Sequence, residues 1–290
     1  MSSVDTQTCY RHPNRETAVS CSSCGNPICP DCMTPTPVGM RCPDCSKQRT
    51  EVRTARNLTA EPTLTYVLIA INVIIFLAEM LGGTTTQASG DISNQLSVWG
   101  AGIYDGELVG VSQGEWYRIV TGGFLHDGLL HVGFNMYLLW YLGQMMEPAI
   151  GKVRFGALYF VSLLGGSLGV MLLDPFQPTV GASGAVFGLI GAAVIAQRAQ
   201  GIPIMQSGLG MLLLLNLVIT FILPGISIGG HVGGLLFGVA AGYLLLVWAP
   251  NQRWQGAANA ALGIVVALGF AAAVGAIWAA EYAVRHGALI

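Results

Sequence analysis

Residues 181–198 read GASGAVFGLIGAAVIAQR, and the fold class of the chain is most readily inferred from this stretch. It carries no charge before Arg198, and it comes directly after the helix-breaking segment 174–178, which reads DPFQP. Its later glycines recur at helical spacing, at Gly184, Gly188 and Gly191. Small residues on one face allow two helices to approach closely inside a bilayer. We therefore expect a membrane helix over 183–198 that packs tightly against a neighbour.

The chain beyond residue 62 repeats this apolar character. A bilayer-spanning helix needs about 20 mostly apolar residues, and six further segments are candidates: 63–81, 126–147, 153–173, 205–223, 229–248 and 258–280. In the whole chain 53% of residues are hydrophobic and 10% are charged, whereas soluble domains have roughly 25% charged residues. The sequence therefore predicts an all-α polytopic membrane protein in which spans 183–198 and 229–248 are neighbours. The balance of 13 basic and 15 acidic side chains gives no reason to expect a nucleic-acid partner.

The first 46 residues form a polar, cysteine-rich head. All seven cysteines lie here. Six of them form three pairs whose members are separated by two residues, and Cys9 and His12 have the same spacing. A two-residue gap allows one tight turn to direct both side chains to a single ion. The eight candidate ligands are Cys9, His12, Cys21, Cys24, Cys29, Cys32, Cys42 and Cys45. They suffice for two saturated tetrahedral sites, so we expect two structural zinc ions; the alternative for His12 is an ordinary surface histidine.

The distribution of positive charge predicts the orientation of the chain. Residues 47–62 form a basic juxtamembrane linker, and cytoplasmic loops carry an excess of Lys and Arg. With the head in the reducing cytoplasm, the later basic residues Lys152, Arg154, Arg198 and Arg253 also fall on the inner side. We therefore predict a multi-pass protein of the plasma membrane with a cytoplasmic head.

The segment 82–125 is too polar to span a bilayer and then faces the outside. It is long for an unstructured connection, and such segments usually carry helices of their own or a function. Residues 111–118 read VSQGEWYR and indicate an amphipathic stretch at the outer interface.

Polar and ionisable residues inside membrane spans are expensive and usually functional. Ser183 and His231 begin their spans at the same predicted depth, near the outer face, and a histidine that removes the serine proton creates a nucleophile. His131 and Asn135 lie four residues apart on one helix face and can direct donors at an oxyanion. Because Glu147 lies at the opposite end of its span, the sequence predicts a Ser–His dyad. The alternatives are a serine that bonds its own helix backbone and a polar clamp between helices.

These residues occur in motifs that resemble those of the rhomboid intramembrane serine proteases. Residues 181–184 match the motif GxSG, residues 230–238 match the small-His-xx-Gly-xxx-Gly motif, and residues 131–135 match HxxxN. Residues 116–118 resemble WxR and residues 143–151 resemble GxxxExxxG. The ordered match covers about residues 63–250.

The resemblance implies an endopeptidase that cleaves in or beside the transmembrane helices of membrane-protein substrates, without a catalytic cofactor. It implies that Ser183 is the nucleophile and that His231 is the general base, with the active site towards the outer face. It also implies that His131, Asn135 and the Ser183 amide stabilise the oxyanion. Supporting roles are implied for Gly181, Gly234, Trp116, Arg118, Glu147 and Phe187, the last of which packs on the catalytic histidine in the family.

The head resembles the B-box family of zinc domains over residues 9–45. This resemblance implies two interleaved sites, one formed by Cys9, His12, Cys29 and Cys32 and the other by Cys21, Cys24, Cys42 and Cys45. Sequential pairing along the chain is the alternative. A role in binding a protein partner competes with a purely structural role for the head.

The predicted organisation is a B-box-like zinc-binding domain at 1–46, the linker at 47–62, a six-helix rhomboid core at 63–250, and a seventh helix with a short tail at 251–290. One alternative to proteolysis is a non-proteolytic rhomboid-like protein that binds membrane clients. Silent relatives typically lack the serine or the histidine, and both are present here. The other is a transporter with a proton relay, but the sequence has neither inverted repeats nor paired broken helices.

Overall fold

The computed structural model describes residues 7–36, 39–47, 61–81, 91–206 and 208–287. The chain divides into two compact units, one that ends at Leu58 and one that begins at Thr59. The predicted basic linker, 47–62, therefore lies almost entirely outside the described residues.

The first unit is built from two short antiparallel hairpins. Strand β1 (Gln7–Cys9) pairs with β2 (His12–Thr17), and β3 (Thr34–Thr36) pairs with β4 (Gly39–Arg41). Two helical turns, η1 (Pro30–Cys32) and α1 (Pro43–Ser46), each begin with a proline directly after a cysteine. The buried apolar cluster of this unit consists of six cysteines and Ile28. Such a small apolar core cannot stabilise a fold by itself, so we infer that the stability of the unit depends on its cysteines.

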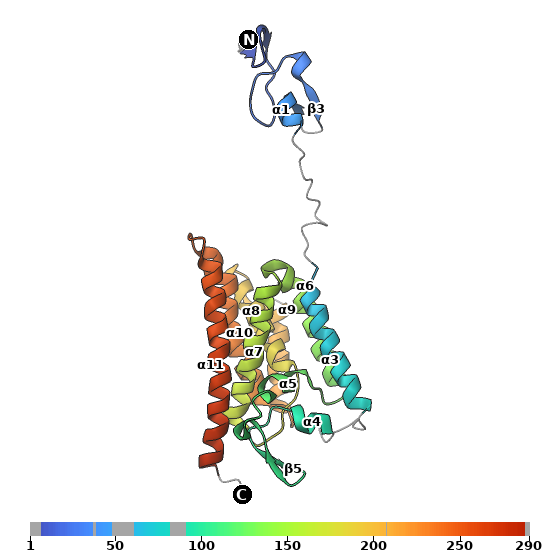
Figure 1. Ribbon diagram of the computed structural model, residues 1–290, viewed down its shortest axis with the longest axis vertical. Helices are drawn as coiled ribbons and strands as arrows, with labels where there is room; N and C mark the ends of the chain where they lie inside the picture. Colours follow the sequence, from blue (N-terminus) through green and yellow to red (C-terminus); the bar gives the residue numbers. More distant parts are fainter. Residues whose placement is uncertain (1–6, 37–38, 48–60, 82–90, 207, 288–290) are drawn as a thin grey trace. The chain divides into compact units, whose positions relative to one another are not determined.

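The second unit is a helical bundle (Figure 1). Its seven long helices among the described residues are α3 (Thr63–Leu81), α6 (Leu129–Ile150), α7 (Lys152–Leu173), α8 (Ser183–Ala199), α9 (Gly208–Ile222), α10 (Ile228–Gly242) and α11 (Ala257–His286). By length and composition α3, α7, α11 and α10 with its extension to Asn251 can each cross a membrane. The predicted helical membrane bundle with a small Cys/His-rich head is confirmed.

Several helix ends differ from the predicted spans for local reasons. Helix α6 begins at Leu129 instead of residue 126 because Gly128 before it has a φ of +87°, outside the helical region. Before α9 the chain forms a separate 3-10 turn, η4 (Ile204–Gln206). Helix α10 passes into a π-helix, η5 (Tyr243–Trp248), and then a 3-10 turn, η6 (Ala249–Asn251).

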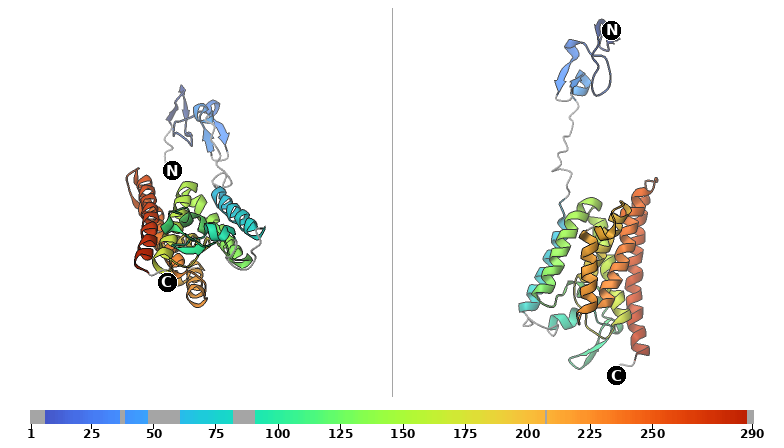
Figure 2. Two further views of the ribbon diagram at one scale, coloured as in Figure 1. Left: turned by 60° about the horizontal axis from the view of Figure 1, so that its bottom comes forward. Right: turned by 180° about the vertical axis from the view of Figure 1, so that it is seen from behind.

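Helices α7, α8 and α10 form the centre of the bundle, and α11 packs along α7 (Figures 1 and 2). At the opposite edge α3 packs against α6. The three central backbones converge at the carbonyl oxygen of Gly230, which would lie 2.9 Å from a Cβ at Gly166 and 3.1 Å from one at Gly184. Real Cβ atoms essentially never show the first distance and rarely show the second, so glycine at both positions favours this close approach. The predicted contact between 183–198 and 229–248 is confirmed.

The described part of the predicted outer segment, residues 91–125 and called the outer segment below, carries short helices of its own, as expected, and residues 111–118 are divided between two of its elements. It contains α4 (Asp91–Leu96), a hairpin of β5 (Gly102–Tyr104) and β6 (Glu107–Val109), η2 (Val111–Gln113), α5 (Arg118–Thr121) and η3 (Gly122–Phe124). Gly114, with a φ of +91°, ends η2 and separates it from α5. A continuous helix is thus excluded by one left-handed glycine.

Glu147 holds α3 and α6 together at the end of the bundle opposite Ser183. Its carboxylate is 2% exposed and accepts hydrogen bonds from Leu64 N–H at 2.8 Å, Thr65 N–H at 2.7 Å and Thr65 Oγ1 at 2.7 Å. The first N–H groups of a helix have no intrahelical acceptor, and they favour a negative charge. Glu147 therefore caps α3 from a neighbouring helix.

We expect Glu147→Ala to lower the free energy of unfolding by about 3 kcal/mol, because it leaves buried donors unpaired and removes a charged acceptor. Thermal unfolding in detergent measures the change. The control is Gln144→Ala, since Gln144 Nε2 joins the same two helices through Tyr66 Oη at an exposed position. Its expected cost is below about 1 kcal/mol. Equal destabilisation by the two variants would contradict the role given to Glu147.

Candidate active site and metal sites

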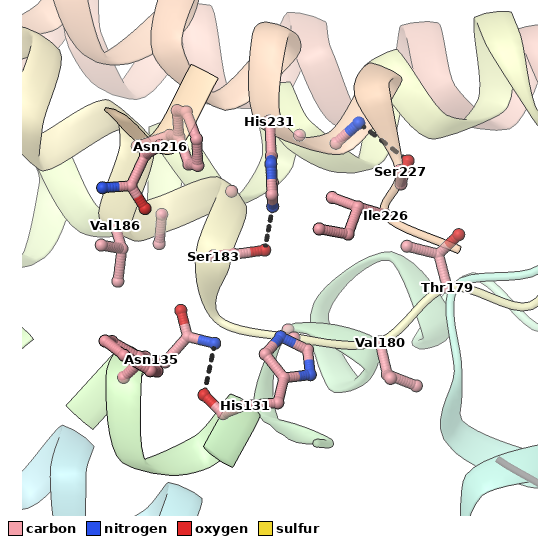
Figure 3. Close-up of a pocket in the computed structure, with 18 of the residues that line it drawn as sticks. His131, Asn135, Thr179, Val180, Ser183, Val186, Asn216, Ile226, Ser227 and His231 are labelled. Carbon is pink, nitrogen blue, oxygen red and sulfur yellow. Dashed lines mark hydrogen bonds between the residues drawn. The ribbon is translucent and has the colours of Figure 1, made fainter. Parts of the chain in front are cut away.

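The bundle brings together a serine and a histidine that are 48 residues apart. Ser183 begins α8, and His231 lies in the first turn of α10 at the same end of the bundle. Ser183 Oγ and His231 Nε2 are 2.8 Å apart (Figure 3). This is the distance of a hydrogen bond between a nucleophile and its base.

The loop before Ser183 is fixed by the outer segment. Thr179 and Val98 exchange two backbone hydrogen bonds of 2.9 Å, and Gly181 N–H donates to Gly122 O at 2.9 Å. Gly181 has a φ of +128°, which a residue with a side chain rarely adopts. At the start of α8 the Val186 N–H donates to Ala182 O. The Ser183 N–H lies before this bond, among the first N–H groups of the helix, which have no acceptor within the helix.

His231 is stacked on one face of its ring and contacted at both nitrogens. Phe187, one turn after Ser183 on α8, stacks on the imidazole with ring centroids 4.2 Å apart and planes at 20°. Ser227 caps α10 by accepting the Gly230 N–H at 3.0 Å. His231 Nδ1 lies 2.7 Å from Thr220 Oγ1 on α9. Thr220 was not predicted as a site residue, although it is one of two polar side chains in the apolar helix α9 and lies 11 residues before His231.

His131 and Asn135 face the same cavity from the first turns of α6 (Figure 3). The Asp127 N–H donates to His131 Nδ1 at 3.4 Å, which leaves the proton of the neutral ring on Nε2. Asn135 Nδ2 donates one hydrogen to His131 O at 3.1 Å and keeps a second one. Both side chains therefore retain a donor that an oxyanion can use.

The cavity around Ser183 has a volume of about 680 Å³. Ligand-binding pockets typically have volumes of about 300–1,000 Å³. Its apolar walls come largely from α6 and α9, including Phe134, Tyr137, Leu215 and Ile219. The polar groups of Ser183 and His231 lie on α8 and α10. The arrangement suits a short extended segment of apolar polypeptide beside a reactive hydroxyl.

The predicted supporting residues lie around this site in different ways. Arg118 is 1% exposed and ties the outer segment by donating Nη1 to Asn94 O at 2.7 Å and Nε to Glu115 Oε2 at 2.7 Å. Burial alone would raise the pKa of Glu115, but hydrogen bonds from Arg118 and the Gly110 N–H outweigh it and lower that pKa. Trp116, in contrast, is 56% exposed, as expected of an interfacial aromatic side chain.

The two remaining supporting residues lie away from the reactive atoms. The Cα of Gly234 faces the backbone of Gly184, where a side chain would clash. Glu147 caps α3 at the far end of the bundle. These residues shape the helices that carry the site.

We expect Gly181→Ala to reduce the predicted proteolytic activity by roughly 100-fold, which is the effect of losing one donor to the oxyanion. A Cβ at Gly181 would lie 2.8 Å from His131 Nε2 and 3.4 Å from Ser183 Oγ, and the φ of +128° adds backbone strain. Initial cleavage rates measure the effect. The control is Gly133→Ala on α6, where an added Cβ meets nothing within 4 Å. If Gly181→Ala cleaves as fast as the control, the predicted role of His131 as an oxyanion donor is refuted.

The cysteines and His12 form two clusters in the first unit. One contains Cys9, His12, Cys29 and Cys32, and the other contains Cys21, Cys24, Cys42 and Cys45. Within each cluster the ligand atoms lie within 4.8 Å of one another. The structure thus adopts the interleaved pairing and not the sequential one.

The donor sets fit zinc. Zinc binds thiolate sulfur at about 2.3 Å and imidazole nitrogen at about 2.0 Å in a tetrahedron, so neighbouring ligand atoms lie about 3.5–3.8 Å apart. His12 Nδ1 lies 3.3 Å from Cys29 Sγ, 3.4 Å from Cys32 Sγ and 3.8 Å from Cys9 Sγ. Cys24 Sγ lies 3.8 Å from Cys42 Sγ. Both clusters could therefore hold a metal ion through four ligands each.

Comparison with known proteins identifies relatives of the membrane unit. A family model described as "Rhomboid domain" matches residues 113–248. The chain is 31% identical over 228 residues to "Rhomboid protease GluP" of Bacillus subtilis, covering 77% of this chain and 42% of that protein. It is 30% identical over 221 residues to "RHOMBOID-like protein 6, mitochondrial" of Arabidopsis thaliana, covering 66% of this chain and 71% of that protein.

A third relative, "RHOMBOID-like protein 5" of Arabidopsis thaliana, is 38% identical over 145 residues, which cover 47% of this chain and 46% of that protein. The matched region thus spans less than half the length of this relative and of the Bacillus protein. The residues that the family model matches include both Ser183 and His231.

Proposed function

Because the chain belongs to the rhomboid family, we propose that it is an intramembrane serine endopeptidase with Ser183 as nucleophile and His231 as general base. The observation that carries the proposal is the hydrogen bond of 2.8 Å between Ser183 Oγ and His231 Nε2, at the wall of a cavity of about 680 Å³. A reactive hydroxyl paired with a base inside an apolar, peptide-sized cavity suits hydrolysis of a peptide bond.

In the proposed reaction His231 Nε2 accepts the Ser183 proton while Oγ attacks the scissile carbonyl carbon. The negative charge on the carbonyl oxygen is stabilised by donors from His131 Nε2, Asn135 Nδ2 and the Ser183 N–H. His231 then gives its proton to the leaving amine, and an acyl-enzyme forms. A water molecule deprotonated by His231 releases the acyl group and restores Ser183.

The proposed substrates are membrane proteins with a transmembrane helix. Backbone hydrogen bonds shield the peptide bonds of a helix in lipid, so the scissile segment must unwind first. Substrate helices with glycine, proline or polar residues near one end are therefore expected to react fastest. The apolar walls on α6 and α9 suit the side chains of such a segment.

The proposal extends to location and metal content. The chain is a multi-pass membrane protein, and we assign it to the plasma membrane with the head in the cytoplasm. The basic residues that lie in or beside terminal helical turns on the side of the bundle opposite Ser183 agree with the positive-inside rule; they are Lys152, Arg154, Arg198 and Arg253. We further assign one structural zinc ion to each cysteine cluster and, as a prediction, a protein partner to the head.

Reconstitution of the purified full chain in lipid vesicles with single-span reporter proteins tests the proposed function. Mass spectrometry of the products is expected to locate cleavage in or beside the reporter's span, and a fluorophosphonate probe is expected to label Ser183. The His231→Ala variant is expected to do neither at a measurable rate. Intact reporters and unlabelled Ser183 across several helix-destabilised spans would overturn the proposal and favour a client-binding role.

A further inference from the structure

The ring of His231 is engaged at both of its nitrogen atoms. Nε2 lies 2.8 Å from Ser183 Oγ, and Nδ1 lies 2.7 Å from Thr220 Oγ1. The first contact comes from α8 and the second from α9, so two helices hold the ring of a third. The contact at Nδ1 takes no part in the proposed bond-making steps, so any role that it has must lie in holding the ring of His231.

The hydroxyl of Thr220 has one hydrogen, and the surroundings determine where it points. Thr220 Oγ1 donates to the backbone oxygen of Asn216, four residues earlier, at 2.7 Å. The oxygen is then left with acceptor capacity only. The hydrogen of the bond to His231 must therefore lie on Nδ1, and the neutral ring carries its lone pair on Nε2. This is the tautomer that can take a proton from Ser183.

The position of Thr220 on α9 supports a specific role for this contact. Thr220 is 2% exposed, whereas its neighbours Val218, Phe221 and Ile222 are 43%, 62% and 70% exposed. The outer half of α9 thus turns one hydroxyl residue inwards and its apolar residues outwards. The inward side chain meets the histidine.

We propose that Thr220 is a positioning residue that fixes the tautomer and orientation of His231. This inference rests on the proposed function, and it deepens it by naming the group that orients the base. Thr220 Oγ1 accepts the Nδ1–H and thereby aims the Nε2 lone pair at Ser183 Oγ. When Nε2 has taken the serine proton, the same bond keeps the charged ring in place until the proton passes to the leaving amine. Phe187 restricts tilting of the ring, and Thr220 restricts its rotation.

Three variants of the full chain in lipid vesicles test the proposal. Thr220→Val keeps the shape but removes the acceptor, and kcat is expected to fall roughly tenfold while KM changes less than about twofold. Thr220→Ser restores an acceptor and is expected to recover kcat to within about threefold of the wild type. The control is Thr121→Val, because Thr121 Oγ1 bonds to Leu96 O in the outer segment and not to His231. Its kcat is expected to stay within about twofold of the wild type.

A spectroscopic measurement gives an answer that does not depend on cleavage. In ¹⁵N-histidine-labelled protein, with His231 assigned by its loss in His231→Asn, the wild type is expected to carry the proton on Nδ1. Thr220→Val is expected to shift a measurable fraction to Nε2, and Thr220→Ser is not. An unchanged kcat and tautomer in Thr220→Val, or equal losses in the Val and Ser variants, would overturn the proposal. If the wild type cleaves no reporter, the proposed function fails, and the tautomer measurement alone decides about Thr220.

Discussion

Replacing Ser183 by alanine is expected to lower the rate of reporter cleavage by roughly 10⁴-fold or more, the effect seen when a serine protease loses its nucleophile. The expectation rests on the bond of 2.8 Å between Ser183 Oγ and His231 Nε2. Without the hydroxyl the proposed acyl-enzyme cannot form, and the remaining oxyanion donors can assist only the direct attack of a water molecule. Single-turnover cleavage in lipid vesicles, with mass spectrometry of the products, measures the loss.

A matched control separates loss of the nucleophile from damage to the cavity. Ser167 also lines the cavity, but its hydroxyl donates to Ile119 O at 2.7 Å and to no catalytic residue. Ser167→Ala is expected to cost about 1 kcal/mol of stability and to change the cleavage rate by less than about threefold. Cleavage by Ser183→Ala within tenfold of the wild type, at the same bond, would remove Ser183 from the proposed mechanism.

Removing zinc is expected to unfold the first unit and to leave the helical bundle folded. Binding of structural zinc stabilises small finger domains by about 10–16 kcal/mol. The buried cluster of this unit offers six cysteines and Ile28 in place of an apolar core. The purified chain is expected to carry two zinc ions. After treatment with a strong chelator, trypsin is expected to cut after Arg11, Arg15 and Arg41 at least about 100-fold faster. Protease-resistant apoprotein without metal would refute the assignment.

Paired substitutions test which ligands share an ion. Cys24 and Cys42 belong to one cluster, with their sulfur atoms 3.8 Å apart. The double variant Cys24→Ser with Cys42→Ser is therefore expected to retain one zinc ion per chain. The double variant Cys29→Ser with Cys42→Ser removes one ligand from each cluster and is expected to retain none at limiting zinc. The reverse pattern would show that the ions bind sequential pairs.

Much of the site could be predicted because its residues occur in short, regular patterns. Ser183 and His231 begin apolar spans at the same depth, and glycines at helical spacing predicted that those spans touch; α8 and α10 do so. His131 and Asn135 lie four residues apart, so one helix turn presents both to the same cavity. Periodicity along one helix survives folding, which is why the placement of these residues could be predicted.

Other features could not be inferred because they depend on contacts between distant segments. Thr220 is one hydroxyl in an apolar helix, and its importance depends on the rotation of α9 that turns it towards His231. The sequence predicted an amphipathic stretch over 111–118, but it did not show that Gly114 divides this stretch or that buried Arg118 donates to the backbone oxygen of Asn94 in α4. Such backbone partners leave no pattern in the sequence.

The amino-acid sequence by itself determined that this is a helical membrane protein with a cysteine-rich head, because hydropathy, helical spacing of glycines and ligand spacing are local properties of the chain. Only the tertiary structure decided which cysteines share a cluster, which residue faces Nδ1 of His231, and how Glu147 caps α3. Each of these depends on atoms from segments far apart in sequence meeting within hydrogen-bond or ligand distance. For Glu147 and His231 that meeting is set by the packing of α3 against α6 and of α8, α9 and α10 around one another, and for the cysteines by the fold of the first unit.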